Sequence, residues 1–242
     1  MIARSDEMMS ENLYSPHTLP KIALFGGSFD PLHNGHLGIM HAVLGELGIE
    51  HLIILPTFCS PFKSRSLLSP QARLSLCELT AAHLAECYPK ARIEVCDFEI
   101  ARAKPTYSIE SVRYLQARLR QECAAGRGVD SHYSSQRLGF VLGWDNFESF
   151  HLWRDFTSLA RALHLFVFDR GGHSEGEFRT LLEGFGIASL RARFIPFAHA
   201  ISSTRIRERL SRGDFSEIPP FLLPTLKKFL QKPCYNGAQN LS

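Results

Sequence analysis

The chain has 242 residues, of which 45% are hydrophobic, so it can bury the core of one α/β domain, and two full domains are not expected. Its 27 basic and 24 acidic residues leave a formal charge of +3, too small a surplus to indicate a nucleic-acid-binding protein. The six cysteines form no Cys-x-x-Cys pair, and no apolar run approaches the roughly 18 residues that span a membrane, so we expect a cytoplasmic protein with reduced cysteines.

The two ends of the chain differ in composition from the part between them. Residues 1–19 are polar and lack the apolar core of a signal peptide, so we expect a disordered extension there. One domain is expected over residues 20–232, with C-terminal helices from about residue 202, and residues 233–242 are expected to form a flexible tail.

The first predicted strand, Ile22–Phe25, is continuously apolar, as a buried parallel strand requires. The run Gly26–His36 follows it and leads into a helix whose apolar residues recur at helical spacing. Glycines at 26 and 27 allow a ligand to approach the backbone closely, and the amide groups at the start of the helix favour an anion. This strand-to-helix turn is therefore predicted to bind phosphate.

Two histidines stand in this turn. His33 and His36 are three residues apart with Gly35 between them, so both imidazoles can reach one bound anion. An ordinary glycine-rich turn is the alternative interpretation. A zinc site is a weaker one, because no cysteine pair or third ligand follows at metal spacing.

The next elements alternate between strand and helix. A buried strand at His51–Leu55 is followed by a proline-containing loop and by a helix for which Ser69 is the expected N-cap. Ile93–Val95 is typical of a short strand. A helix at Ile109–Cys123 follows, with Ser108 as its expected N-cap, and the glycine- and serine-rich stretch after it is expected to be a surface loop.

The second half of the chain continues this alternation. A buried strand at Leu138–Leu142 ends in Gly143-Trp144-Asp145, at the position where open α/β sheets bind ligands. The remaining helices and strands are expected at Phe156–Ala160, Leu163–Phe168, Glu175–Leu182, Arg193–Ile195, Ser202–Leu210 and Pro220–Leu230. The order predicts an α/β fold, a doubly wound and mainly parallel sheet with a small C-terminal helical appendage.

A second motif, Ser202-Ser203-Thr204-Arg205-Ile206-Arg207, begins the helix expected from residue 202. An N-capped amphipathic helix would satisfy this pattern without any ligand. Helical side chains lean toward the N-terminus, however, so Arg207 would return to the end that carries the amides and hydroxyls and could hold a pyrophosphate through two hydrogen bonds.

The run Gly26–His36 resembles the signature Gly-Gly-x-Phe-Asp-Pro-x-His-x-Gly-His of the nucleotidyltransferase superfamily at every fixed position. The second motif is similar to the Ser-x-Thr-x-x-Arg element that closes the triphosphate side of the nucleotide site in that superfamily. The resemblance implies nucleotidyl transfer with three catalytic residues, His33, His36 and Arg207. The ATP-binding residues that it implies are Gly26, Gly27, Ser28, Phe29, Gly35, Gly143, Asp145, Ser202 and Thr204.

Several segments in between resemble bacterial nicotinate-nucleotide adenylyltransferases, and the resemblance extends over about residues 21–212. They include Pro61-Phe62-Lys63, Pro105-Thr106-Tyr107-Ser108, Phe150-His151-Leu152-Trp153 and Asp169-Arg170-Gly171-Gly172. In that family the second segment offers backbone amides to the nicotinate carboxylate, and the tryptophan stacks on the pyridine ring. The residues thereby implied to bind nicotinate mononucleotide are Lys63, Thr106, Tyr107, Trp153 and Arg170.

Three of these roles have alternatives. Trp153 would also fit a position in the core, and Asp145, which the resemblance assigns to ribose hydroxyls, would also fit a helix N-cap. Gly171 stands where the family has proline, which leaves a phosphate-binding role of Arg170 open.

The resemblance implies that nicotinate mononucleotide attacks the α-phosphorus of ATP and expels pyrophosphate. Mg²⁺ would be bound mainly through ATP, with no protein metal site. ATP and nicotinate mononucleotide are the expected partners, without nucleic acid or membrane, and a homo-oligomer is left open. The alternatives are a transferase of the same fold for nicotinamide mononucleotide or another phosphorylated substrate, and a non-catalytic nucleotide-binding regulator.

Overall fold

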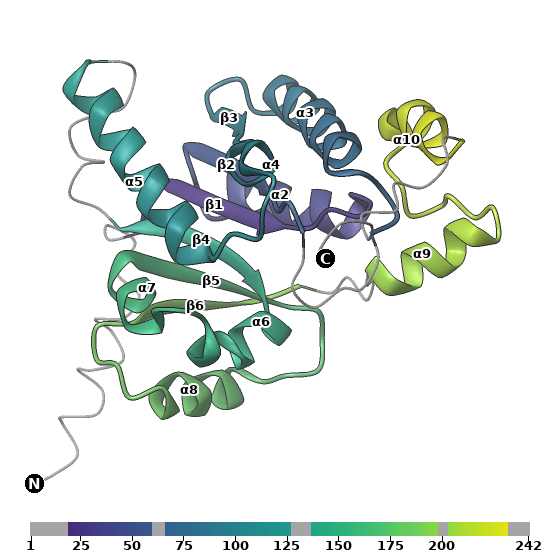
Figure 1. Cartoon of the computed structure of the whole chain (residues 1–242). Coiled ribbons are helices and arrows are strands. Elements are labelled where there is room, and N and C mark those ends of the chain that lie inside the picture. Colours follow the sequence, from purple (N-terminus) through teal and green to yellow (C-terminus); the bar gives the residue numbers. More distant parts are fainter. Residues whose placement is uncertain (1–18, 60–65, 127–136, 198–202, 232–242) are drawn as a thin grey trace, which may run out of the picture.

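A computed structural model describes residues 19–59, 66–126, 137–197 and 203–231 of the chain. Its centre is a six-stranded sheet in the order β3-β2-β1-β4-β5-β6, in which each pair of neighbours is parallel (Figure 1). The strands are β1 (Ile22–Gly27), β2 (His51–Pro56), β3 (Arg92–Val95), β4 (Leu138–Gly143), β5 (Leu163–Asp169) and β6 (Arg191–Pro196). The predicted parallel sheet is confirmed.

The order of the strands reverses between β1 and β4. The chain first adds β2 and β3 on one side of β1 and then places β4, β5 and β6 on its other side. The pairing of Phe25 with Val141 brings the two central strands to the same edge, where β1 ends at Gly27 and β4 ends at Gly143. Connections that leave neighbouring strands toward opposite faces open a crevice at such an edge, which is where ligands bind in open α/β sheets.

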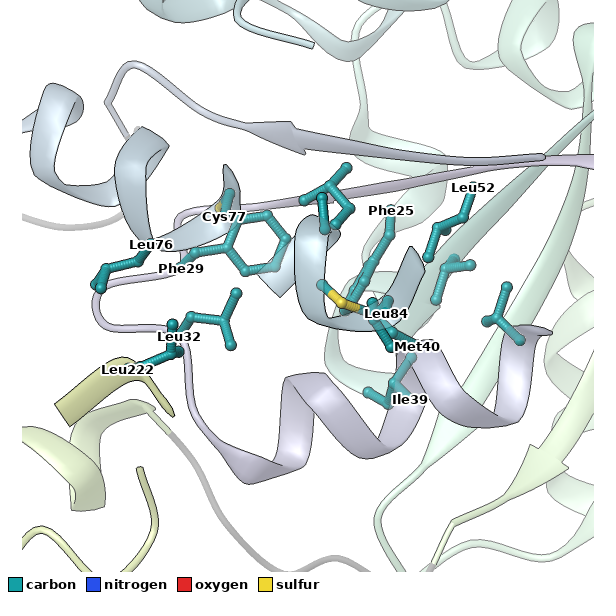
Figure 2. Packing of buried hydrophobic residues seen from close by; sticks show 14 of the residues in the cluster. Phe25, Phe29, Leu32, Ile39, Met40, Leu52, Leu76, Cys77, Leu84 and Leu222 are labelled. Carbon is teal, nitrogen blue, oxygen red and sulfur yellow. The ribbon is translucent and has the colours of Figure 1, made fainter. Parts of the chain in front are cut away.

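One face of the sheet packs against helices from both ends of the chain. Figure 2 shows part of this core, with Phe25 and Leu52 from the sheet near Met40 and Leu84 from the helices, and with Leu222 near Leu32. The helices on this face are α2 (Asn34–Gly45), α3 (Pro70–Cys87), α9 (Ser203–Ser211), η4 (Pro220–Leu222) and α10 (Leu223–Leu230). The expected C-terminal helices therefore share the core of the domain.

The opposite face is covered by helices from the middle of the chain. They bury a second apolar cluster, which includes Ile53 and Leu165 from the sheet and Leu115 and Phe147 from the helices. These helices are α5 (Ser108–Ala124), α6 (Trp144–Glu148), η3 (Phe150–Leu152), α7 (Phe156–Ala162) and α8 (Glu175–Gly184). Helices on both faces of one parallel sheet are the predicted doubly wound arrangement.

Local signals predicted some helix starts correctly and missed others. Ser69 caps α3 as expected, because its hydroxyl accepts a hydrogen bond from the Ala72 amide at 3.2 Å. Ser108 is the first residue of α5, so its prediction as the N-cap was wrong; Tyr107 takes that position. The short helix α4 (Phe98–Arg102) was not predicted, since it is too short for a helical period to be visible.

In the part of the chain that the structure describes, no helix combines the length and the apolar composition needed to cross a membrane.

Candidate active site

The β1–α2 turn takes its shape from an aromatic side chain. Phe29 has a left-handed backbone conformation with φ of 46°, and its ring is fully buried edge-on against Phe25, with 5.4 Å between ring centroids. A Cβ atom added at Gly27 would lie 3.1 Å from the Phe29 ring, closer than an unstrained contact allows. The absence of a side chain at Gly27 therefore allows the Phe29 ring to pack directly against the backbone of the turn.

His33 and His36 lie side by side at the start of α2. Their ring centroids are 3.8 Å apart and the ring planes differ by 31°. His33 is the N-cap of the helix and only 1% exposed, whereas His36 is half-buried and meets the edge of the Phe29 ring at 5.1 Å. The structure thus brings the two predicted catalytic imidazoles together at the positive end of a helix, where an anion is stabilised.

A buried arginine from α3 holds the same turn from behind. Arg73 is 1% exposed, and its guanidinium donates hydrogen bonds to the carbonyl oxygens of Ser28 (2.7 Å), Thr57 (2.6 Å) and Phe58 (2.7 Å). Burial lowers the pKa of Arg73, and the nearby charge of Asp30 opposes this shift. One side chain therefore ties the β1–α2 turn to the start of the segment that follows β2.

A buried carboxylate ties the turn to the end of that segment. Asp30 is fully buried and accepts hydrogen bonds from the amides of Leu67 and Leu68, both at 2.8 Å. No role was predicted for Asp30 or Arg73 from the sequence. A signal for Arg73 was present, because it occupies the same helical face as Ala72 and Leu76, and a charged residue on a buried face requires specific partners.

The ends of β4 and β5 bring Gly143 and Arg170 together. A Cβ atom at Gly143 would lie 3.9 Å from Nη2 of Arg170, so the guanidinium reaches over the end of β4. Gly143 is also the N-cap of α6, and Asp145 is exposed in the first turn of that helix. The alternative interpretation of Asp145 as a helix cap is therefore wrong, and its contact with ribose stays a prediction.

The turn after β5 is held by a buried carboxylate, Asp169, for which no role was predicted from the sequence. Asp169 accepts hydrogen bonds from the amides of Gly171 (3.1 Å) and His173 (3.2 Å) and contacts Nδ1 of His173 at 2.8 Å. The hydrogen bond with Asp169 raises the pKa of His173, whose ring stacks on Trp144 at 4.0 Å. Gly171 has φ of 93°, which proline cannot adopt, so this turn differs physically from a proline-containing one.

Three of the residues predicted to bind nicotinate mononucleotide, Thr106, Tyr107 and Trp153, lie on two segments that meet where Arg154 contacts Tyr107. Trp153 is half-buried and packs edge-on against Phe140 of β4, with 5.9 Å between the ring centroids. Tyr107 is 52% exposed, and the guanidinium carbon of Arg154 lies 4.5 Å from the centroid of its ring. Thr106 donates its hydroxyl to the Lys104 carbonyl at 3.2 Å.

Helix α9 is packed into the core close to the start of α2. Its Ile206 is 1% exposed within the first core, and the carbonyl of Glu217, in the segment after α9, accepts a hydrogen bond from the Asn34 amide at 2.8 Å. Arg207 is half-buried in this helix, which lies beyond the carboxyl edge of the sheet (Figure 1). Lys63, Ser202 and the side chain of Thr204 lie outside the described residues, so their predicted roles stay predictions.

Among the side chains that the structure describes, no three of His, Cys, Asp or Glu gather as ligands for a metal ion.

Comparison with known proteins places this arrangement among nucleotidyltransferases. A family model described as cytidylyltransferase-like matches residues 24–209. A protein of Nitratiruptor sp. with the name "Probable nicotinate-nucleotide adenylyltransferase" is 35% identical over 153 residues, which cover 63% of this chain and 75% of the relative. A relative of the same name from Neisseria gonorrhoeae is 31% identical over 216 residues, covering 87% of this chain and 97% of its own.

Solved structures show the same fold. The nicotinic acid mononucleotide adenylyltransferase of Plasmodium falciparum, complexed with NaAD, superimposes with a TM-score of 0.62 and covers 86% of this chain and 95% of its own. Its sequence identity is 18%, so the likeness concerns the arrangement of strands and helices.

Proposed function

This chain belongs to the cytidylyltransferase-like family, and we propose that its β1–α2 turn catalyses the family's chemistry. The chain transfers the adenylyl group of ATP to nicotinate mononucleotide, giving deamido-NAD and pyrophosphate, a step of NAD biosynthesis. The observation that carries the assignment of the turn is the contact between His33 and His36 at the start of α2, beside the switch point of the sheet.

The roles of the two histidines follow from the charge that moves in the reaction. The 5′-phosphate of nicotinate mononucleotide attacks the α-phosphorus of ATP, the bond to the β-phosphate oxygen breaks, and pyrophosphate leaves. Such a transfer needs positioning and charge stabilisation more than covalent help from the protein. His36, together with the start of α2, would stabilise the transferring phosphate, and His33 would bind a neighbouring phosphate oxygen.

The leaving pyrophosphate would be held from the other side by α9. Arg207 would bind it through two hydrogen bonds, and the hydroxyls of Ser202 and Thr204 would complete the contact. The packing of Ile206 in the core supports this role, and so does the hydrogen bond from Asn34 to Glu217, because Glu217 in turn pairs with Arg209 of α9. Gly26, Gly27, Ser28, Phe29, Gly35, Gly143 and Asp145 are proposed to surround ATP.

Nucleotidyltransferases use a divalent metal ion that ATP carries, and we propose Mg²⁺ here. The described residues offer no carboxylate cage, so the ion would be bound by the phosphate oxygens of ATP and would offset part of their charge. No residue of the protein is proposed as a ligand of this Mg²⁺ ion.

The nicotinate moiety is proposed to bind between Tyr107 and Trp153. The half-buried indole of Trp153 is fixed by Phe140 and leaves part of its surface for stacking on a pyridine ring. Thr106 lies next to Tyr107 in this segment, and Lys63 and Arg170 would contact the phosphate of the mononucleotide.

A parallel assay tests the proposed function. Purified protein is incubated with ATP and Mg²⁺ and with either nicotinate or nicotinamide mononucleotide, and pyrophosphate release and the dinucleotide product are measured. We expect faster release with nicotinate mononucleotide. Equal rates would contradict the selectivity, whereas ATP binding without release in either arm would favour a non-catalytic nucleotide-binding regulator.

A further inference from the structure

Arg154 connects the two segments that are proposed to bind the nicotinate moiety. It follows Trp153 directly in the chain, and its guanidinium carbon lies 4.5 Å from the centre of the Tyr107 ring. A guanidinium over an aromatic face is held by a cation–π interaction and keeps its edge N–H groups available to an anion. The chain therefore presents a fixed positive charge beside the proposed pyridine-stacking residue.

The residues on either side of Arg154 are anchored to different parts of the fold. Trp153 packs against Phe140 of β4, and Asp155 pairs with Arg113 of α5 at 2.6 Å. These two contacts restrict the backbone of Arg154, so its side chain loses less freedom when it binds a ligand.

The backbone amide of Tyr107, the residue whose ring Arg154 contacts, already has a hydrogen-bond partner. The amide of Tyr107 donates a hydrogen bond to the carboxylate of Glu110 at 3.0 Å, and Glu110 in turn pairs with Arg102 at 2.9 Å. A nicotinate carboxylate at this position could not use the Tyr107 amide without displacing Glu110. A donor from another residue is needed if the carboxylate is to be paired.

Arg154 has the charge that this role requires. Its side chain is exposed, and among the described residues it forms no ion pair with a carboxylate. The carboxylates of Asp155 and Glu110 are instead paired with Arg113 and Arg102. A carboxylate can accept two parallel hydrogen bonds from a guanidinium, whereas the carboxamide of nicotinamide is neutral and carries donors of its own.

We propose that Arg154 is the residue by which this chain prefers nicotinate over nicotinamide mononucleotide, through direct pairing of its guanidinium with the nicotinate carboxylate. The inference rests on the proposed function, because it takes nicotinate mononucleotide to be the substrate and its ring to lie at Trp153. Arg154 would recognise the carboxylate of nicotinate, which is the one group by which the two mononucleotides differ.

The test compares Arg154→Gln with the wild-type chain on both mononucleotides. We expect kcat/KM for nicotinate mononucleotide to fall about tenfold, mainly through KM, and kcat/KM for nicotinamide mononucleotide to change by less than about twofold. Arg154→Lys should keep part of the preference, because the charge remains while the paired geometry is lost. Added salt should reduce the preference of the wild-type chain and leave that of Arg154→Gln nearly unchanged.

Arg161→Gln is the matched control, because Arg161 is an exposed arginine at the far end of α7 and should leave both kcat/KM values unchanged. An equal fall on both mononucleotides, or no fall, in Arg154→Gln would overturn the inference and leave the proposed function standing. A wild-type chain that releases no pyrophosphate with either mononucleotide would overturn the proposed function, and the inference with it.

Discussion

At the scale of single residues, the site depends on the contact between two imidazoles. His36 lies between the His33 ring at 3.8 Å and the edge of the Phe29 ring at 5.1 Å, so its position is fixed on two sides before any substrate arrives. A group that is held in place in this way can stabilise charge in a transition state without the cost of reorganisation.

We therefore predict that His36→Ala lowers kcat at least about tenfold, with a smaller effect on KM for ATP. Steady-state pyrophosphate release measures both values. His41→Ala is the control on the same helix, because His41 contacts Tyr88 at 2.9 Å and lies outside the site. Near-normal turnover of His36→Ala would remove this residue from the mechanism.

At the scale of elements, α3 is a support for the active site as well as a cover for the sheet. Its Arg73 joins Ser28 in the β1–α2 turn to Thr57 and Phe58 after β2, while Asp30 in the same turn joins the amides at Leu67 and Leu68. These two sets of hydrogen bonds connect the β1–α2 turn to both ends of the segment that contains Lys63. Displacement of α3 should therefore displace the turn.

Arg73→Lys is predicted to destabilise the protein by about 2–3 kcal/mol, because an ammonium cannot reproduce three directed hydrogen bonds in a buried position. At a temperature where the variant is fully folded, kcat should still fall about tenfold, since the β1–α2 turn is no longer held. Urea unfolding and steady-state kinetics measure the two effects.

Arg120→Lys provides the control for this change, because Arg120 is exposed on α5. A folded Arg73→Lys variant with wild-type kcat would show that Arg73 supports stability alone, and that the turn keeps its shape without it.

At the scale of the whole molecule, the ionic cluster that ties β3 into the sheet lies away from the catalytic edge. Glu94 of β3 contacts Arg92, Arg118 of α5 and the ring of His51, the first residue of β2. Burial alone would raise the pKa of Glu94, but the ring of His51, whose Nε2 lies 3.5 Å from the carboxylate, and the charges of Arg118 and Arg92 lower it to about 2.

This lowered pKa makes the stability of the fold depend on pH. A carboxyl group whose folded-state pKa lies below its ordinary value stabilises the folded state above that ordinary value of 4.5, and the contribution is lost as the pH falls toward about 2. We predict that Glu94→Gln lowers the free energy of unfolding by about 1–2 kcal/mol at pH 7, and that the difference from the wild-type chain shrinks below about pH 4.

Urea unfolding between pH 3 and pH 7 measures this difference. Glu86→Gln, at an exposed position on α3, is the control and should change the stability little at any pH. Because Glu94 lies away from the catalytic edge, Glu94→Gln should keep wild-type kcat where it is folded. A difference that stays constant with pH would contradict the assigned role of the carboxylate.

Much of this protein could be predicted from the sequence because the relevant signals are local. The apolar run at Ile22–Phe25, the cap at Ser69 and the alternation of strands and helices depend on residues within a few positions of one another. The spacing of His33 and His36 likewise predicted that both imidazoles reach the same place, and the structure has the two rings side by side. The sequence by itself determined the doubly wound sheet and the place of the glycine- and histidine-containing turn at its centre.

The tertiary structure decided the contacts that support and extend the site. Arg73 meets Ser28 and Arg154 meets Tyr107 across long stretches of chain, and no local pattern specifies such pairs. The loss of Asp145 as a helix cap and the use of the Tyr107 amide by Glu110 also became visible only in three dimensions. Periodicity reports which face of an element is buried, whereas the partner of a buried charge depends on how the elements pack.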